Sequence, residues 1–147
     1  MASRETGLGM WTLRLKNTSA IVGCAGLMKA GVVAEYAPSL AEAVEAIVAL
    51  TPSAWHHGYA QEALRAVLEH GFAQLELPQL CAVADLPNEA AARLIERVGF
   101  MASGECAGPK HRLRTYALSR EAWLENDSSD AAKLNAAARA AGSPTAR

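Results

Sequence analysis

The stretch Val-Glu-Ala-Ile-Val-Ala-Leu at residues 44–50, followed by Trp-His-His-Gly-Tyr-Ala at residues 55–60, decides the fold that we expect. The first part is short, apolar and rich in small and β-branched residues, which favours a central strand, although residues 41–46 also fit a helix. The second part opens a stretch with helical spacing of apolar residues from 60 to 75. A strand that turns through a glycine into a helix presents free backbone N–H groups at the positive end of the helix dipole. Such a turn is suited to bind an anion.

The sequence on either side predicts further strands and helices. Alternation of apolar and polar residues favours a hairpin of two strands, and the order strand, helix, strand in the middle predicts a parallel pair with right-handed crossovers. Asp85 or Asn88 is expected to cap the second helix, and Gly99 to end it in the left-handed conformation. The expected strands are 11–15, 20–28, 44–50, 80–83, 100–104 and 112–119; the expected helices follow residues 60 and 88, with a loop at 29–41 and a helical turn at 121–124. The predicted fold class is therefore α/β, with a mixed, mostly antiparallel sheet, a central parallel strand pair and helices on its faces.

Composition excludes several classes of function. The 147 residues suffice for one domain, and a net charge of −1 without a basic block argues against binding to nucleic acid. The longest apolar run is far below the roughly 20 residues of a membrane span, and the first residues do not resemble a signal peptide. Three cysteines in no metal-binding spacing indicate reduced thiols. We therefore expect a cytoplasmic protein with no metal, no nucleic-acid partner and no membrane partner.

Two motifs carry a resemblance to a known family. Residues 55–63 read Trp-His-His-Gly-Tyr-Ala-Gln-Glu-Ala, and residues 88–100 begin with Asn and end with Gly-Phe. Together they resemble the cofactor-binding half of the GCN5-related N-acetyltransferases (GNAT family), and the Trp in first place resembles the branch that acetylates the N-termini of ribosomal proteins. The resemblance implies acetyl-CoA as a co-substrate, bound by Val48, Ala49, Leu50, His56, His57, Gly58, Tyr59, Ala60 and Asn88.

Three positions depart from the pattern of that family. His56 stands where the branch usually has glycine, so its side chain is expected either to crowd the pyrophosphate or to donate a hydrogen bond to it. Ile95 stands where many members carry a Tyr that protonates the departing thiolate, and Ala91 replaces a Ser of the N-terminal acetyltransferase branch. Without the resemblance, the same residues fit a plain helix start and a helix cap at Asn88.

Acetyl transfer to an amine requires a base, because an aliphatic amine is mostly protonated near neutral pH. Glu45 is the candidate, since a carboxylate on a strand that is expected to be buried needs a reason to be there. The family often places a Glu base on this strand; an exposed edge carboxylate is the alternative. A backbone N–H near residues 48–50 is expected to polarise the thioester oxygen. Tyr116 is a second-choice acid or substrate contact, with a core aromatic as the alternative.

The resemblance also bears on how the chain is divided. It covers residues 11–124, so we expect an N-terminal extension at 1–10, a GNAT-like domain at 11–124 and a polar, Ala-rich tail at 125–147 that is flexible or partly helical. The family normally has one more strand and two helices before the position of Trp11, and we expect these to be missing. A sheet without its first strand exposes an edge, which favours a homo-oligomer.

Three functions remain open at this stage. The first is an acetyl-CoA-dependent N-acetyltransferase that moves an acetyl group directly to a primary amine, either a peptide N-terminus or a small molecule. The second is a non-catalytic module of the same fold that binds CoA or oligomerises. The third is a small α/β interaction protein in which the glycine turn is incidental. The near-zero net charge gives no preference for an acidic or a basic acceptor.

Overall fold

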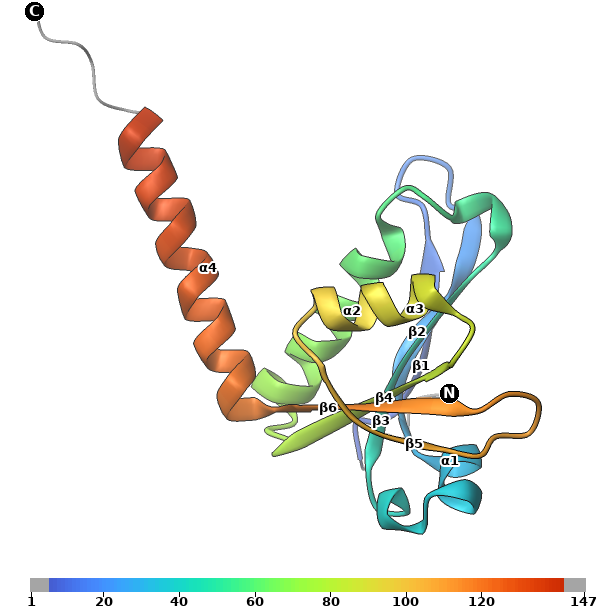
Figure 1. Cartoon of the computed structure of the whole chain (residues 1–147). Coiled ribbons are helices and arrows are strands. Elements are labelled where there is room, and N and C mark those ends of the chain that lie inside the picture. Colours follow the sequence, from blue (N-terminus) through green and yellow to red (C-terminus); the bar gives the residue numbers. More distant parts are fainter. Residues whose placement is uncertain (1–5, 142–147) are drawn as a thin grey trace, which may run out of the picture.

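A computed structural model describes residues 6–141, and these residues fold around a single six-stranded sheet (Figure 1). In the described part of the chain, the strands are β1 (Gly9–Arg14), β2 (Ile21–Lys29), β3 (Val44–Leu50), β4 (Gln79–Asp85), β5 (Met101–Cys106) and β6 (Leu113–Ser119). The α-helices are α1 (Gly31–Tyr36), α2 (Tyr59–Glu69), α3 (Glu89–Arg97) and α4 (Arg120–Ala141).

The sheet has the strand order β1-β2-β3-β4-β6-β5. The neighbours β3 and β4 run parallel, and every other neighbouring pair runs antiparallel. Helix α2 connects the two parallel strands, as a crossover must, because parallel strands cannot be joined by a tight turn. The predicted fold class, a mixed and mostly antiparallel α/β sheet with a central parallel pair, is confirmed.

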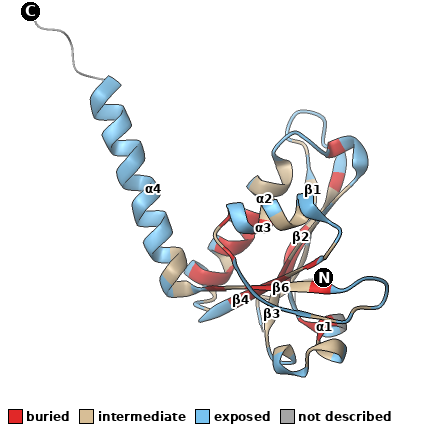
Figure 2. Ribbon diagram, viewed as in Figure 1, coloured by how far each residue is buried: buried red, intermediate tan, exposed pale blue. Residues whose placement is uncertain are grey.

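The hydrophobic core lies between the sheet and the helices α2 and α3. Alternate residues of β4 and β6 point toward these helices, and Figure 2 shows the buried residues concentrated in α2 and in the strands beneath it. The largest fully buried side chains are Tyr116, Phe72, Leu27, Leu64, Leu68 and Leu80. This core packs one face of the sheet against α2 and α3, and so fixes these helices relative to β3 and β4.

Two segments differ from the sequence prediction. The loop expected at 29–41 is wrong in part, because it contains α1 and a short 3-10 helix at Pro38–Leu40. Helix α1 has six residues, of which Val33 is buried, so it is too short to show a periodic pattern. Helix α2 also continues into a π-helical turn at His70–Gln74, where a regular helix was expected.

Helix α4 begins where a helical turn was expected but continues to Ala141, across the expected boundary at residue 124. Ser119 caps its start, since the Ala122 N–H donates to Ser119 Oγ at 3.1 Å. None of its residues is buried, and it projects away from the sheet (Figures 1 and 2). At its start, Ala122 and Trp123 pack against the core, and the Trp123 ring stacks on Phe72. Beyond residue 130 the helix is rich in alanine, which has the highest helix propensity. The division into domain and tail stays a prediction, and its outermost parts lie outside the described residues.

Strand β1 begins at Gly9, within the predicted N-terminal extension. It forms one edge of the sheet and pairs with β2 alone among the described strands.

No helix in the described part of the chain is long and apolar enough to cross a membrane.

Candidate functional site

The parallel strands β3 and β4 separate soon after they meet. A single pair, Glu45 with Cys81, joins them near the amino ends of both strands. By contrast, β2 and β3 pair along the whole of β3, from Gly23–Leu50 to Lys29–Val44. The carboxyl half of β3 therefore has no strand partner on its β4 side. In open α/β sheets, a gap at the carboxyl ends of adjacent parallel strands is where ligands bind.

The backbone of β3 presents hydrogen-bonding groups to this gap in alternation. The Thr51 N–H donates to the Val22 carbonyl at 2.8 Å, and the Ala30 N–H donates to the Ala43 carbonyl at 3.0 Å. In an antiparallel ladder, this register directs the polar groups of the odd-numbered β3 residues toward β2. The N–H groups of Val48 and Leu50 therefore face the gap, whereas the backbone of Ala49 is used within the sheet.

The turn before α2 supplies a second set of free backbone donors. Gly58 caps the helix with φ 78° and ψ 2°, in the left-handed region. The first helical bond runs from the Glu62 N–H to the Gly58 carbonyl at 3.1 Å, and the backbone N–H groups of residues 56–61 donate to no other described group. These donors lie at the positive end of the helix dipole, where an anionic group is stabilised.

A cleft of about 550 Å³ joins the end of β3, this turn and the start of α3. Its lining brings together eight of the nine residues that the sequence predicts as cofactor contacts: Val48, Ala49, Leu50, His56, Gly58, Tyr59, Ala60 and Asn88. No described Asp or Glu lines the cleft, and Arg97 is the permanently charged side chain among its described lining residues. The cleft is therefore apolar at its walls and suited electrostatically to an anionic ligand.

His57 is the predicted contact that does not line this cleft. Its Nδ1 lies 2.6 Å from the Trp55 carbonyl oxygen, and its ring stacks on Tyr59 with the ring centroids 5.3 Å apart. The indole N–H of Trp55 in turn donates to the Leu50 carbonyl at 3.2 Å. These contacts tie the turn to the end of β3, so the side chain of His57 shapes the turn rather than the cleft wall.

His56 adopts φ 64°, in the left-handed region that glycine occupies at little cost. This conformation gives a physical reason why glycine suits the position in the resembling sequences. The His56 side chain is exposed and lines the cleft. It is therefore placed to donate a hydrogen bond from a ring N–H to a ligand in the cleft.

Asn88 caps α3, as expected. Its Oδ1 accepts a hydrogen bond from the Ala91 N–H at 3.1 Å. The Nδ2 group donates to no described residue. One end of the amide thus fixes the side chain on the helix, and the other end is left to donate to a ligand.

Glu45 is half-buried on β3, beside Cys81 of β4. Burial raises the pKa of the Glu45 carboxyl above its ordinary value. Burial, together with the negative charge of Glu45, raises the pKa of the Cys81 thiol to about 12. Glu45 thus has the higher proton affinity that suits a base, whereas Cys81 stays a neutral thiol and is a poor nucleophile.

Tyr116 does not share a face of the sheet with Glu45. The register places Glu45, Cys81 and Ala117 in one row, while Tyr116 pairs with Ala82 on the face that packs against the helices. Tyr116 is fully buried, and its hydroxyl has no hydrogen-bond partner in the described chain, although the Arg114 guanidinium lies close enough to interact with it. The structure does not bring the two predicted catalytic residues together, and it favours the core-aromatic alternative for Tyr116.

Tyr116→Phe is accordingly expected to leave acetyl transfer unchanged. It is also expected to keep the free energy of unfolding or raise it by about 1 kcal/mol, because it removes a buried hydroxyl that lacks a good partner. Urea unfolding followed by circular dichroism, together with an acetyl-transfer assay, tests both parts. A tenfold loss of kcat with unchanged stability would return Tyr116 to the catalytic site.

Sequence reasoning missed several residues of the cleft wall. These are Ala54, Trp55, Gln61, Ala90, Leu94 and Arg97, while Ala91 entered the prediction only as the replacement of a proton donor. Ala90, Leu94 and Arg97 follow one another at spacings of four and three, so the helical period carried onward from the start of α3 would have found them. Ile95, by contrast, is buried in the core and does not line the cleft.

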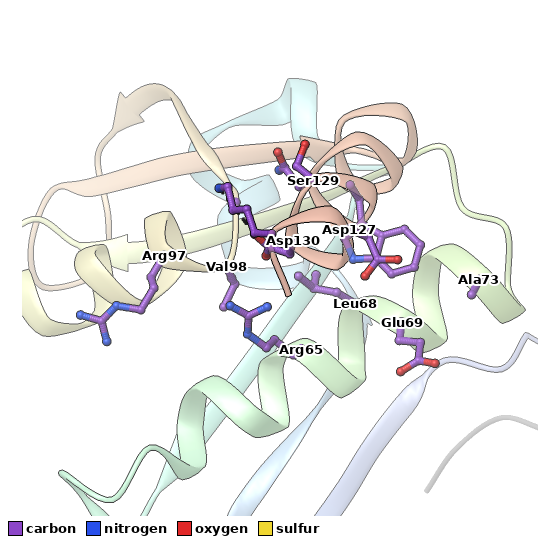
Figure 3. Close-up of a pocket in the computed structure, with 13 residues that line it drawn as sticks. Arg65, Leu68, Glu69, Ala73, Arg97, Val98, Asp127, Ser129 and Asp130 are labelled. Carbon is purple, nitrogen blue, oxygen red and sulfur yellow. Dashed lines mark ion pairs between the residues drawn. The ribbon is translucent and has the colours of Figure 1, made fainter. Parts of the chain in front are cut away.

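A second cavity, of about 570 Å³, lies between α2, α3 and the first part of α4 (Figure 3). Its lining carries both charge signs, since it includes Arg65, Arg97 and Lys133 as well as Glu69, Asp127 and Asp130. It contains none of the residues predicted as site residues from the sequence. In the described chain, no group of three His, Cys, Asp or Glu residues is arranged to hold a metal ion.

Comparison with known proteins identifies the family to which the sequence and the fold are similar. The family model described as "Acetyltransferase (GNAT) domain" matches residues 1–101 of the chain. The uncharacterized N-acetyltransferase YoaA of Bacillus subtilis (strain 168) is 36% identical over 55 residues, which cover 37% of this chain and 31% of that protein. The matched segments thus span less than a third of the length of the curated relatives.

Solved structures share the fold at low sequence identity. An acetyltransferase (GNAT family) from Bacillus anthracis has a TM-score of 0.63 and 23% identity, over 76% of this chain and 66% of that one. The spermidine/spermine N-acetyltransferase SpeG from Vibrio cholerae has a TM-score of 0.67 and 15% identity, over 84% of this chain and 71% of that one. At these identities the likeness concerns the fold.

Proposed function

Because the chain belongs to the GNAT acetyltransferase family, we propose that it binds acetyl-CoA in the cleft at the end of β3 and transfers the acetyl group to a primary amine. The observation that carries the proposal is the gap beyond the Glu45–Cys81 pair, with free N–H groups on β3 and on the turn before α2. The proposed cofactor contacts are those given by the sequence, with one change. Val48 and Leu50 contribute their backbone N–H groups, whereas the backbone of Ala49 is used within the sheet.

The residues of the cleft fit a ligand with an apolar arm and a diphosphate. The N–H groups of residues 56–61 are placed for the diphosphate oxygens, and the absence of described carboxylates from the lining avoids repulsion. When bound, acetyl-CoA supplies an electrophilic thioester carbonyl. The Val48 and Leu50 N–H groups are placed to bind and polarise an oxygen in the gap, and Asn88 Nδ2 to orient the arm.

Glu45 is the proposed base, and it lies on the face of the sheet opposite to the one that packs against α2 and α3. Its carboxylate would remove a proton from the acceptor ammonium, directly or through a water, which frees the nitrogen lone pair. The neutral Cys81 thiol beside it has a pKa of about 12, which supports direct transfer to the amine rather than an acyl-cysteine. Mechanistically, the proposal needs no covalent enzyme intermediate.

The acceptor is proposed as a primary amine of a small molecule or a peptide N-terminus. The fold neighbour from Vibrio cholerae is named for spermidine and spermine, which supports the amine class without selecting within it. The Trp55 motif supports the branch that acetylates ribosomal-protein N-termini. Strand β1 is a sheet edge in the described chain, and we propose that a second copy of the chain pairs there.

Acetyl-CoA is expected to stabilise the protein against heat. At a hundred times its dissociation constant, a ligand that binds the native state alone adds about 2.7 kcal/mol, which corresponds to roughly 5 °C for a domain of this size. Differential scanning fluorimetry with and without acetyl-CoA measures this shift, with adenosine as the control ligand that lacks the diphosphate and the arm. No shift at millimolar acetyl-CoA would refute the proposed binding.

A non-catalytic CoA-binding module is the second candidate, because Ile95 and Ala91 replace the two usual proton donors of the family. A panel of primary amines separates the two functions, with release of free thiol from acetyl-CoA as the readout. Thiol release that depends on an amine supports the enzyme. Saturable binding of acetyl-CoA without thiol release from any amine supports the binding module.

A further inference from the structure

Arg97 occupies a distinct place in the cleft. It is the last residue of α3, and it shares one helix face with Ala90 and Leu94, which also line the cleft. It lies nine positions after Asn88, which corresponds to about 14 Å along the helix axis. Its guanidinium therefore lies at the opposite end of the α3 wall from the Asn88 amide that faces the β3 gap.

The Arg97 guanidinium has no partner in the described chain. Among the α3 arginines, Arg93 pairs with Glu89 at 3.8 Å, whereas no ion pair or hydrogen bond engages the Arg97 side chain. Figure 3 shows Arg97 pointing away from Asp127 and Asp130 of the adjoining cavity. An exposed, unpaired guanidinium keeps its planar set of donors available for a phosphate.

We propose that Arg97 binds the 3′-phosphate on the adenosine ribose of CoA and makes the protein prefer CoA to dephospho-CoA. This inference rests on the proposed function. The acyl end of the ligand is assigned to β3, and its diphosphate to the turn at residues 56–61. The adenosine then lies toward the outer part of the cleft, where Arg97 is the permanent positive charge among the described lining residues.

The expected preference is moderate because Arg97 is exposed. A charge-assisted hydrogen bond contributes more than a neutral one, but solvent and salt weaken it at an exposed site. The expected discrimination is about tenfold in dissociation constant at low ionic strength, at the lower end for hydrogen bonds to charged groups.

Isothermal titration calorimetry with CoA and dephospho-CoA tests the proposal on the full chain. The wild type is expected to bind CoA about tenfold more tightly than dephospho-CoA. Arg97→Gln is expected to weaken CoA about tenfold and to leave dephospho-CoA unchanged, so the preference disappears. Arg93→Gln is the matched control, since Arg93 lies one turn earlier on α3, is also exposed and does not line the cleft. It is expected to keep the preference.

The outcomes separate this inference from the proposed function. If the wild type binds both ligands equally, or if Arg97→Gln weakens both equally, the role of Arg97 is refuted while CoA binding stands. The same holds if Arg97→Gln keeps the preference of the wild type. If the wild type binds neither ligand, the proposed function fails and this inference fails with it.

Discussion

Glu45→Gln is expected to lower kcat/KM for acetyl transfer by about 10²–10⁴-fold, the usual contribution of a positioned general base. Glutamine keeps the size of the side chain and its place beside Cys81 but cannot accept the proton of the acceptor ammonium. Thiol release from acetyl-CoA with the best amine of the panel measures the change. Glu42→Gln is the control, because Glu42 is an exposed carboxylate three residues away that pairs with Lys29 at 2.9 Å.

The pH dependence gives this prediction a second readout. Burial raises the pKa of Glu45, so the wild-type rate is expected to rise with pH as this carboxyl ionises, and Glu45→Gln is expected to lack that limb. The folded state binds the Glu45 proton more tightly than the unfolded state. Its contribution to stability therefore falls as pH rises from the ordinary pKa of 4.5 through the raised value. At neutral pH, Glu45→Gln is therefore expected to be at least as stable as the wild type. An unchanged rate of acetyl transfer in Glu45→Gln would remove Glu45 from the mechanism.

Gly58→Pro is expected to weaken acetyl-CoA binding by at least about 100-fold, which corresponds to the loss of one or two hydrogen bonds to a charged group. Proline removes the Gly58 N–H and holds φ near −65°, whereas the structure has φ 78° at this residue. The turn must then rebuild, and the neighbouring N–H groups lose their common direction. Titration calorimetry measures the affinity, and far-UV circular dichroism checks that the helices remain.

Gly58→Ala is the matched control for that change. Alanine keeps the N–H, and a Cβ at this position meets no described atom within 4 Å. Holding alanine in the left-handed region costs about 1–2 kcal/mol of stability. Affinity for acetyl-CoA is therefore expected to stay within a few-fold of the wild type at temperatures below the melting point. Wild-type affinity in Gly58→Pro would show that the turn does not bind the ligand.

Local signals sufficed for much of the fold. The bounds of β3 agree with the prediction at both ends, because a β-branched run is followed directly by Thr-Pro, which stops a strand. Gly99 ends α3 with φ 111°, as expected for a glycine after an amphipathic helix. Motif spacing predicted that Asn88 caps α3 and that residues of the turn before α2 line the cleft. The roles of these residues in binding remain proposals.

The remaining features depend on facts that single-chain patterns do not carry. The opposite placement of Glu45 and Tyr116 follows from strand register, which composition does not specify. The length of α4 was missed because none of its residues is buried, so no apolar stripe marks the helix beyond its first turn. Each is a matter of three-dimensional arrangement or of weak summed preferences.

The single Glu45–Cys81 pair also divides the backbone hydrogen bonding of the sheet into two parts, which one hydrophobic core joins. One part consists of β1, β2 and β3, and the other of β4, β6 and β5. One residue pair joins their backbones. A ligand whose amide groups form hydrogen bonds with the backbone of the even-numbered β3 residues would take the place of the missing strand partner there. Such a ligand would then add backbone hydrogen bonds between the two halves of the sheet, beyond the one pair that the chain itself provides.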